Sequence, residues 1–149
     1  MITAQDIMET RVISVSPDTG IHAAVKILLD NHINGVPVID EQGEIVGILC
    51  QSDLIFQQKE LPLPPIFSIL DSIIPLGSSK KLDDEVKKIA AATVEQAMVR
   101  TPVTVSKDTP VSQIAALMVE KHFHTIPVAE GNRLVGIIGK EDILKTMTG

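Results

Sequence analysis

The sequence predicts an α+β fold in which two copies of a β-α-β-β-α unit pack together. The outline of one hairpin, GVPVIDEQGEIVGIL at residues 35–49, returns as TIPVAEGNRLVGIIG at residues 125–139. A shift of 90 residues also aligns Met8 with Met98 and His32 with His122. About a dozen positions in roughly fifty are identical, which indicates duplication of one supersecondary unit.

Each unit is predicted to begin with a short strand followed by a helix. Residues 13–15 and 103–105 are β-branched and alternating, as is typical of strands. Thr19 and Thr109 are expected to cap the helices, with Pro110 at the first helical position, where its missing N–H costs nothing. Apolar residues then recur at helical spacing: Ile21, Ala24, Val25 and Leu28 in the first unit, and Val111, Ile114, Ala115 and Met118 in the second.

Two further strands and a second helix complete each unit. The strands are joined by polar tips at residues 40–44 and 130–133, and the second helices are expected to open near Ser52 and Glu141. A unit of about fifty residues buries a core poorly on its own, so the two units are expected to pack against each other. The predicted organisation is a first repeat at 1–57, a connecting segment at 58–93 and a second repeat at 94–149.

The connecting segment has two halves. Residues 61–76 are apolar and cannot form one continuous helix, because four prolines interrupt them. From Ser78 or Ser79 the pattern predicts a capped amphipathic helix that could run on toward Met98, with Leu82, Val86, Ile89 and Thr93 on one face. The apolar half either packs over its own module or forms a docking patch for a second subunit or a partner. Dimer contact is favoured over membrane contact, because Asp71 lies in the middle of the stretch and few cations flank it.

Composition excludes several classes of function. The net charge of -6 and the absence of Trp and Tyr argue against a nucleic-acid surface, which needs clustered cations and stacking rings. A single cysteine, Cys50, excludes an internal disulfide and suits a reducing compartment. No apolar run is long enough to cross a bilayer and the N-terminus has no signal core, so the expected location is the cytoplasm, without membrane contact.

Two paired patterns carry a family resemblance. NGVPV at 34–38 is paired with GILCQSD at 47–53, and HTIPV at 124–128 is paired with GIIGKED at 136–142. Each repeat thereby resembles a cystathionine-beta-synthase (CBS) domain, and the pair resembles a Bateman module. The resemblance implies a small antiparallel sheet with helices in each repeat, pseudo-twofold pairing, adenosine nucleotides in two clefts between the repeats, and a homodimer of two modules.

Asp53 and Asp142 are the candidate ribose ligands. Each is expected on the first turn of a helix, from where a carboxylate can accept two hydrogen bonds from a ribose diol. The glycine that opens each pattern, Gly47 or Gly136, would let a ligand ring approach the backbone. The alternative is that each aspartate only complements the helix N-terminus, and the family pattern favours ribose.

The resemblance assigns adenine recognition mainly to the main chain. Residues before proline avoid the helical region, so Val36 and Ile126 are expected to hold their peptide groups outward. The same segments also fit ordinary buried edge strands. The expected contacts are the backbone at Asn34, Gly35, Val36, Pro37, His124, Thr125, Ile126 and Pro127 and near Ile13 and Val103, with Ile48 and Ile137 against the ring face.

Phosphate contacts are where the sequence departs from the family pattern. Cys50 and Gly139 occupy positions where relatives carry a Ser or Thr hydroxyl. Lys140 follows Gly139 at a helix N-terminus, which favours an anion, and His124 holds a position from which relatives aim a histidine at phosphate. Each could instead be a surface or edge residue. The first repeat offers the uncharged Gln51, Ser52 and Asn34, so the second cleft is expected to suit a charged nucleotide better.

The leading hypothesis is a stand-alone regulatory module. It would bind AMP, ADP or ATP, with S-adenosylmethionine as a further ligand, and signal to a regulated protein that the sequence does not identify. The alternative is a structural dimerisation module with vestigial clefts. An enzyme is not expected, and neither is a metal, because the sequence has no metal-ligand cluster, no nucleophile paired with a base and no GxxxxGK[ST] loop.

Overall fold

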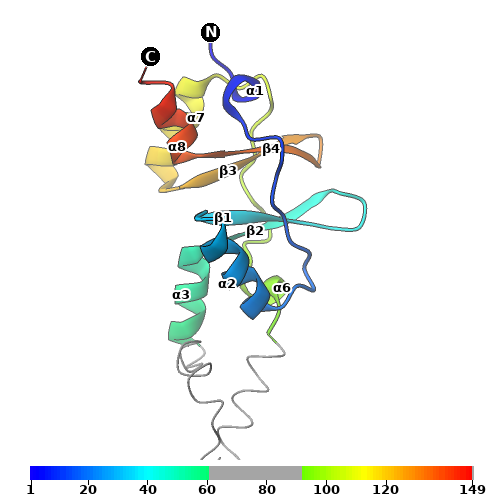
Figure 1. Ribbon diagram of the computed structural model, residues 1–149. Coiled ribbons are helices and arrows are strands. Elements are labelled where there is room, and N and C mark those ends of the chain that lie inside the picture. The colour runs from blue at the N-terminus through cyan, green and yellow to red at the C-terminus, as the bar shows by residue number, and fades with distance from the viewer. Residues whose placement is uncertain (61–91, 149) are drawn as a thin grey trace, which may run out of the picture.

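The computed structural model describes residues 1–60 and 92–148, and it places the two repeats one above the other (Figure 1). The sheets face each other across the middle of the molecule, and the longer helices lie on their outer faces. The apolar segment at 61–76 and nearly all of the helix predicted from residue 78 onward lie outside the described residues.

Each repeat contains a helix, two antiparallel strands and a second helix in chain order, which confirms the predicted α+β fold. In the first repeat these elements are α2 (Ile21–Asp30), β1 (Gly35–Ile39), β2 (Ile45–Cys50) and α3 (Gln51–Glu60). In the second repeat they are α7 (Val111–Lys121), β3 (Thr125–Glu130), β4 (Arg133–Gly139) and α8 (Lys140–Lys145).

Each hairpin is extended on both sides by single bridges. Val15 bridges Val38 of β1 in parallel, as the predicted first strand requires, and Val105 bridges Val128 of β3 in the same way. On the opposite edge, the partner comes from the other repeat. Val99 bridges Ile48 of β2, and Glu9 bridges Ile137 of β4, both antiparallel.

This exchange begins with two short helices, α1 (Ala4–Ile7) and α6 (Val94–Ala97). Ala4 is fully buried in the core of the second repeat, and Val94 is fully buried in the core of the first. Figure 1 shows α1 beside α7, at the opposite end of the molecule from the repeat whose sequence follows it. Each repeat is therefore completed by a segment that lies at the start of the other repeat in the chain. We call these two segments, residues 4–13 and 94–103, the exchanged segments.

Sequence reasoning missed α1 and α6, although both carry a helix-start signal. The Thr3 N–H donates to an Asp6 carboxylate oxygen at 2.9 Å, and the Thr93 N–H donates to the Gln96 side-chain oxygen at 3.0 Å. Both are capping boxes, in which the third helical residue reaches back to the residue that starts the helix. The two boxes are 90 residues apart and so belong to the repeat.

Thr93 also corrects the expected course of the connecting helix. Its backbone is extended, with φ -117° and ψ 162°, and it bridges Gly20. The expectation that the helix beginning near residue 78 could run on toward Met98 is therefore wrong. A threonine that caps α6 cannot also lie in the interior of a continuous helix.

The predicted caps of the long helices are wrong by one residue. The N-caps are Gly20 and Pro110, so neither Thr19 nor Thr109 caps a helix and Pro110 precedes its first turn. The threonine hydroxyls close the preceding turns instead, since Thr19 Oγ1 accepts from the Ser16 N–H at 3.1 Å and Thr109 repeats the bond.

Candidate functional site

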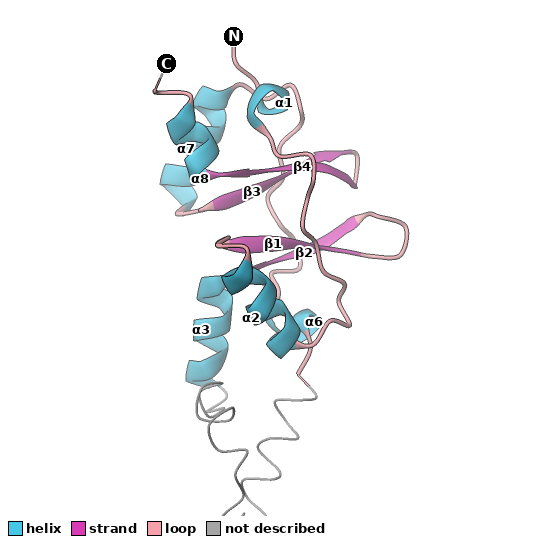
Figure 2. Ribbon diagram, viewed as in Figure 1, coloured by secondary structure: helices cyan, strands magenta, loops and turns pink. Residues whose placement is uncertain are grey.

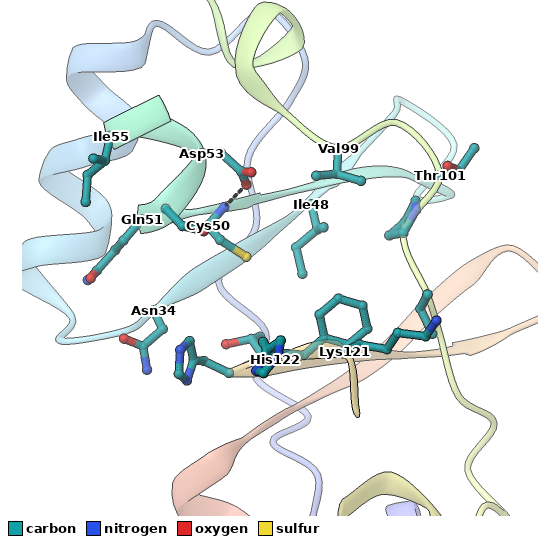
Figure 3. A pocket seen from close by; sticks show the side chains of 16 residues that line it. Asn34, Ile48, Cys50, Gln51, Asp53, Ile55, Val99, Thr101, Lys121 and His122 are labelled. Atoms are coloured by element: carbon teal, nitrogen blue, oxygen red, sulfur yellow. Dashed lines mark hydrogen bonds between the residues drawn. The ribbon is translucent and has the colours of Figure 1, made fainter. Parts of the chain in front are cut away.

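Within the described part of the chain, a cavity lies between the repeats beside each predicted ribose aspartate. The first cleft, of about 470 Å³, lies beside Asp53 and is shown in Figure 3. The second cleft, of about 240 Å³, lies beside Asp142. The exchanged segments build both of them, because Val103 lies in the cleft of Asp53 and Ile13 lies in the cleft of Asp142.

Most predicted site residues line one cleft or the other. The first cleft is lined by the predicted residues Asn34, Ile48, Gln51, Ser52, Asp53, Val103, His124 and Thr125. The second is lined by the predicted residues Ile13, Asn34, Gly35, His124, Thr125, Ile137, Gly139, Lys140 and Asp142. Asn34 and His124 hold equivalent positions in the repeats, and both line both clefts, so the two clefts share a wall.

Four predicted adenine contacts lie in the core instead. Val36, Pro37, Ile126 and Pro127 are fully buried and line neither cleft. The carbonyl of Pro37 accepts a hydrogen bond from the Val15 N–H at 3.1 Å, and Pro127 repeats this in the second repeat. At these four positions the structure favours a buried strand over direct ligand contact, although the strands are not at an edge, because Val15 and Val105 bridge them on the side away from β2 and β4.

The two aspartates make the same helix-start hydrogen bond. Asp53 Oδ2 accepts from the Cys50 N–H at 2.8 Å, and Asp142 Oδ2 accepts from the Gly139 N–H at 2.7 Å. The other carboxylate oxygen of each makes no hydrogen bond within the described residues. One oxygen therefore serves the helix start, while the second remains able to accept from a ligand hydroxyl.

Burial alters the acidity of two groups in the first cleft. Desolvation raises the pKa of Asp53 above its ordinary 3.8, and the bond from the Cys50 N–H opposes this rise. Burial, together with the nearby Asp53 charge, raises the pKa of the Cys50 thiol to about 11. The thiol is thus protonated at neutral pH, which makes it a poor nucleophile.

The roles expected for Gly47 and Gly136 need correction. A Cβ on Gly47 would lie 2.6 Å from Met98 Sδ, and one on Gly136 would lie 2.5 Å from Met8 Sδ. Neither glycine lines a cleft. What the missing Cβ admits is a methionine of the exchanged segment, so the expectation that these glycines let a ligand ring approach is wrong.

The structure adds cleft residues that the sequence did not identify. Most come from the exchanged segments and from the turns that end α2 and α7, where His32 and His122 adopt left-handed backbone conformations with φ of 52° and 58°. The others, Cys50, Ile55 and Glu141, belong to β2, α3 and α8. The added residues are Cys50, Ile55, Val99, Thr101, Pro102, Lys121, His122 and Phe123 in the first cleft, and Glu9, Arg11, His32, Ile33 and Glu141 in the second.

Lys121 changes the expected charge of the first cleft. The first repeat supplies only uncharged candidates for phosphate there, but Lys121 and His122 of the second repeat line the opposite wall (Figure 3). The second cleft contains Lys140, as predicted, together with the acidic Glu9 and Glu141. The first cleft is therefore not limited to the uncharged side chains that the first repeat supplies.

Two other kinds of feature are absent from residues 1–60 and 92–148. No helix there is long and apolar enough to cross a bilayer. Within the same residues, no group of three or more His, Cys, Asp or Glu side chains is arranged to hold a metal ion.

The family follows from comparison with known proteins. The CBS domain model matches the chain twice, at residues 4–60 and 94–149, and the chain therefore belongs to the CBS domain family. The uncharacterized protein MJ1426 of Methanocaldococcus jannaschii is 26% identical over 154 residues, covering 96% of this chain and 89% of that protein. The L-aspartate semialdehyde sulfurtransferase of the same organism is 28% identical over 146 residues, but this match spans only 23% of that protein and 97% of this chain.

Solved CBS domain pairs share the fold over nearly the whole chain. The pair from protein MJ0100, in complex with 5′-methylthioadenosine and S-adenosyl-L-methionine, has a TM-score of 0.74 at 25% identity and covers 100% of this chain and 98% of its own. CBSX2 in complex with AMP has a TM-score of 0.75 at 23% identity, covering 99% of this chain and 97% of its own.

Proposed function

We propose that the chain is a regulatory module that binds an adenosine-containing ligand in the clefts between its repeats. The observation that carries this proposal is a three-part arrangement present in both clefts. An aspartate at a helix start lies beside an isoleucine of the preceding strand and a branched residue of the exchanged segment. These are Asp53, Ile48 and Val103 in the first cleft, and Asp142, Ile137 and Ile13 in the second.

The arrangement fits the chemistry of a nucleoside. A purine ring needs apolar contact on its faces, which Ile48 and Val103 supply, and a ribose diol needs an acceptor, which the unengaged oxygen of Asp53 supplies. Small-molecule sites generally have volumes of about 300–1,000 Å³, and the first cleft, at about 470 Å³, falls in this range.

The MJ0100 pair supports the ligand class, because two adenosyl compounds bind a protein that is 25% identical to this chain over its full length. The proposed ligands are AMP, ADP, ATP or S-adenosylmethionine. Binding would alter how the two repeats pack and so signal to a regulated protein. A reducing compartment such as the cytoplasm suits the single cysteine.

A homodimer is part of the proposal. Leu29 and Val119, at equivalent positions of α2 and α7, are 55% and 75% exposed. Ile55 and Leu144, at equivalent positions of α3 and α8, are 73% and 56% exposed. Large apolar side chains repeated on the outer helices of both repeats suit a contact with a second copy of the chain. Light scattering on Leu29→Asp with Val119→Asp tests this, and a monomeric wild type would contradict it.

We propose a regulatory rather than a catalytic role. The cysteine in the first cleft is held protonated, and neither cleft contains a serine or cysteine hydrogen-bonded to a histidine within the described residues. Such a pair is the usual signature of nucleophilic catalysis.

The test is a thermal-shift series with AMP, ADP, ATP, S-adenosylmethionine and 5′-methylthioadenosine, with GTP as the base-specificity control. A ligand that binds only the folded state adds about 2.7 kcal/mol at a hundredfold excess over its Kd, which raises the melting temperature. We expect at least one adenosine ligand to do so. No shift with any of them is the result expected from a structural module with vestigial clefts.

A further inference from the structure

We propose that the first cleft holds a phosphate-bearing nucleotide through Lys121, whereas the second selects an adenosyl ligand without a phosphate chain. This inference rests on the proposed function and reverses the preference that the sequence suggested. It follows from comparing the clefts position by position, since the repeat makes each residue of one cleft equivalent to a residue of the other.

Lys121 has no cationic counterpart in the second cleft. The equivalent residue is Asn31, whose side-chain amide donates to the Ile27 carbonyl at 2.8 Å and which does not line that cleft. Lys121 is exposed, and it makes no ion pair within the described part of the chain. Its ammonium group is therefore available to a ligand.

The second cleft is lined by more acidic side chains than the first. Glu9 stands where the first cleft has Val99, and Glu141 stands where it has Ser52. Arg11 and Lys140 supply two positive charges against three negative charges from Glu9, Glu141 and Asp142, which gives a formal balance of -1 with histidines neutral. In the first cleft Lys121 balances Asp53, for a net charge of 0.

Volume and charge therefore favour the same cleft for phosphate. The first cleft has about 470 Å³ and the second about 240 Å³, below the usual range of about 300–1,000 Å³ for small-molecule sites. Figure 3 shows Lys121 on the wall opposite Asp53 and Cys50. A nucleotide with its ribose at Asp53 can extend its phosphates toward that wall, where a lysine forms charge-assisted hydrogen bonds.

The test measures binding of ATP and of 5′-methylthioadenosine by calorimetry. Lys121→Gln should weaken the affinity for ATP by roughly threefold to tenfold, the range for a partly solvent-screened contact. The affinity for 5′-methylthioadenosine should change by less than about twofold. Lys140→Gln should leave the affinity for ATP unchanged. Lys26→Gln is the matched control, because Lys26 is exposed on α2 and lines neither cleft.

A complementary variant tests the acidic side of the argument. Glu9→Gln with Glu141→Gln leaves Arg11 and Lys140 against Asp142 alone, so the formal balance of the second cleft becomes +1. Glutamine at position 9 retains an oxygen for the bond that Glu9 accepts from the Arg11 N–H at 2.9 Å. The double variant should gain affinity for AMP in the second cleft.

Three results would overturn the inference while leaving the proposed function intact. These are a larger loss of ATP binding in Lys140→Gln than in Lys121→Gln, an equal loss in Lys26→Gln, or no gain of AMP affinity in the double glutamate variant. If wild type binds none of the adenosine ligands, the proposed function fails together with this inference.

Discussion

Met98 of the second repeat packs closely against Gly47 of the first. A Cβ added at residue 47 would lie only 2.6 Å from the Sδ of Met98. The equivalent pair is Met8 and Gly136. Since the methionines lie on the exchanged segments that also contribute to the clefts, these contacts link the stability of the exchange to the shape of the sites.

Gly47→Ala should lower the free energy of unfolding by about 1–3 kcal/mol, the usual cost of overpacking a core. Gly136→Ala should cost less, because the three atoms nearest to its added Cβ all belong to the flexible Met8 side chain, whereas at Gly47 they include the Val99 carbonyl oxygen at 2.9 Å. Urea unfolding measures both. Gly20→Ala is the steric control, since no atom lies within 4 Å of its Cβ, and any cost there is that of an alanine at the N-cap of α2. Equal costs at all three glycines would contradict the proposed packing.

The reactivity of Cys50 can be used to probe the first cleft, because this residue lines that cleft and is the only cysteine in the chain. Its pKa of about 11, against an ordinary 9.0, leaves on the order of a hundredfold less thiolate than an unfolded chain has at pH 8. Alkylation by iodoacetamide should be slower in the native protein than in urea by about this factor. A ligand in the first cleft should slow the native reaction further. A native rate equal to that in urea would contradict the raised pKa.

The pH dependence of stability should change when Asp53 is replaced by asparagine. Because the pKa of Asp53 is raised in the folded state, its contribution to stability is present below about 3.8 and is lost as the pH rises through the folded pKa. Asp53→Asn keeps an oxygen for the Cys50 N–H but cannot ionise. The variant should therefore gain stability relative to wild type as the pH rises from 4 toward 7.

Urea unfolding at a series of pH values measures this difference. Asp108→Asn serves as the control, since Asp108 is exposed and makes no hydrogen bond through its side chain within the described residues. A difference between Asp53→Asn and wild type that stays constant over the range would show that burial does not perturb Asp53.

Sequence reasoning predicted the repeated units well, because the spacing of apolar residues and the polar hairpin tips are local signals. It also placed Asp53 and Asp142 correctly on first turns of helices. The exchange of the segments around Val94 and Ala4 was missed, since which hairpin a short segment joins is decided by packing between distant residues. The charge of the first cleft depends on the same long-range arrangement.

At some positions the residue type allows more than one role, and the sequence alone could not decide between them. A hydroxyl that could cap a helix, such as that of Thr19, here closes a turn one residue earlier. The glycines at 47 and 136 signalled a close approach, but the sequence alone could not distinguish a ligand from a methionine as the approaching group.

The most direct test of the proposed function is calorimetric titration of wild type, Asp53→Asn, Asp142→Asn and the double variant with adenosine ligands. Asparagine preserves the helix-start bond, since its oxygen can accept from the Cys50 or Gly139 N–H, but it cannot accept from both hydroxyls of a ribose diol. Asp→Asn therefore separates the cap from the ribose contact. The prediction is that each single variant loses binding in one cleft and the double variant in both, with melting temperatures no lower than that of wild type. Unchanged affinity and stoichiometry in all variants would show that these aspartates are helix caps alone.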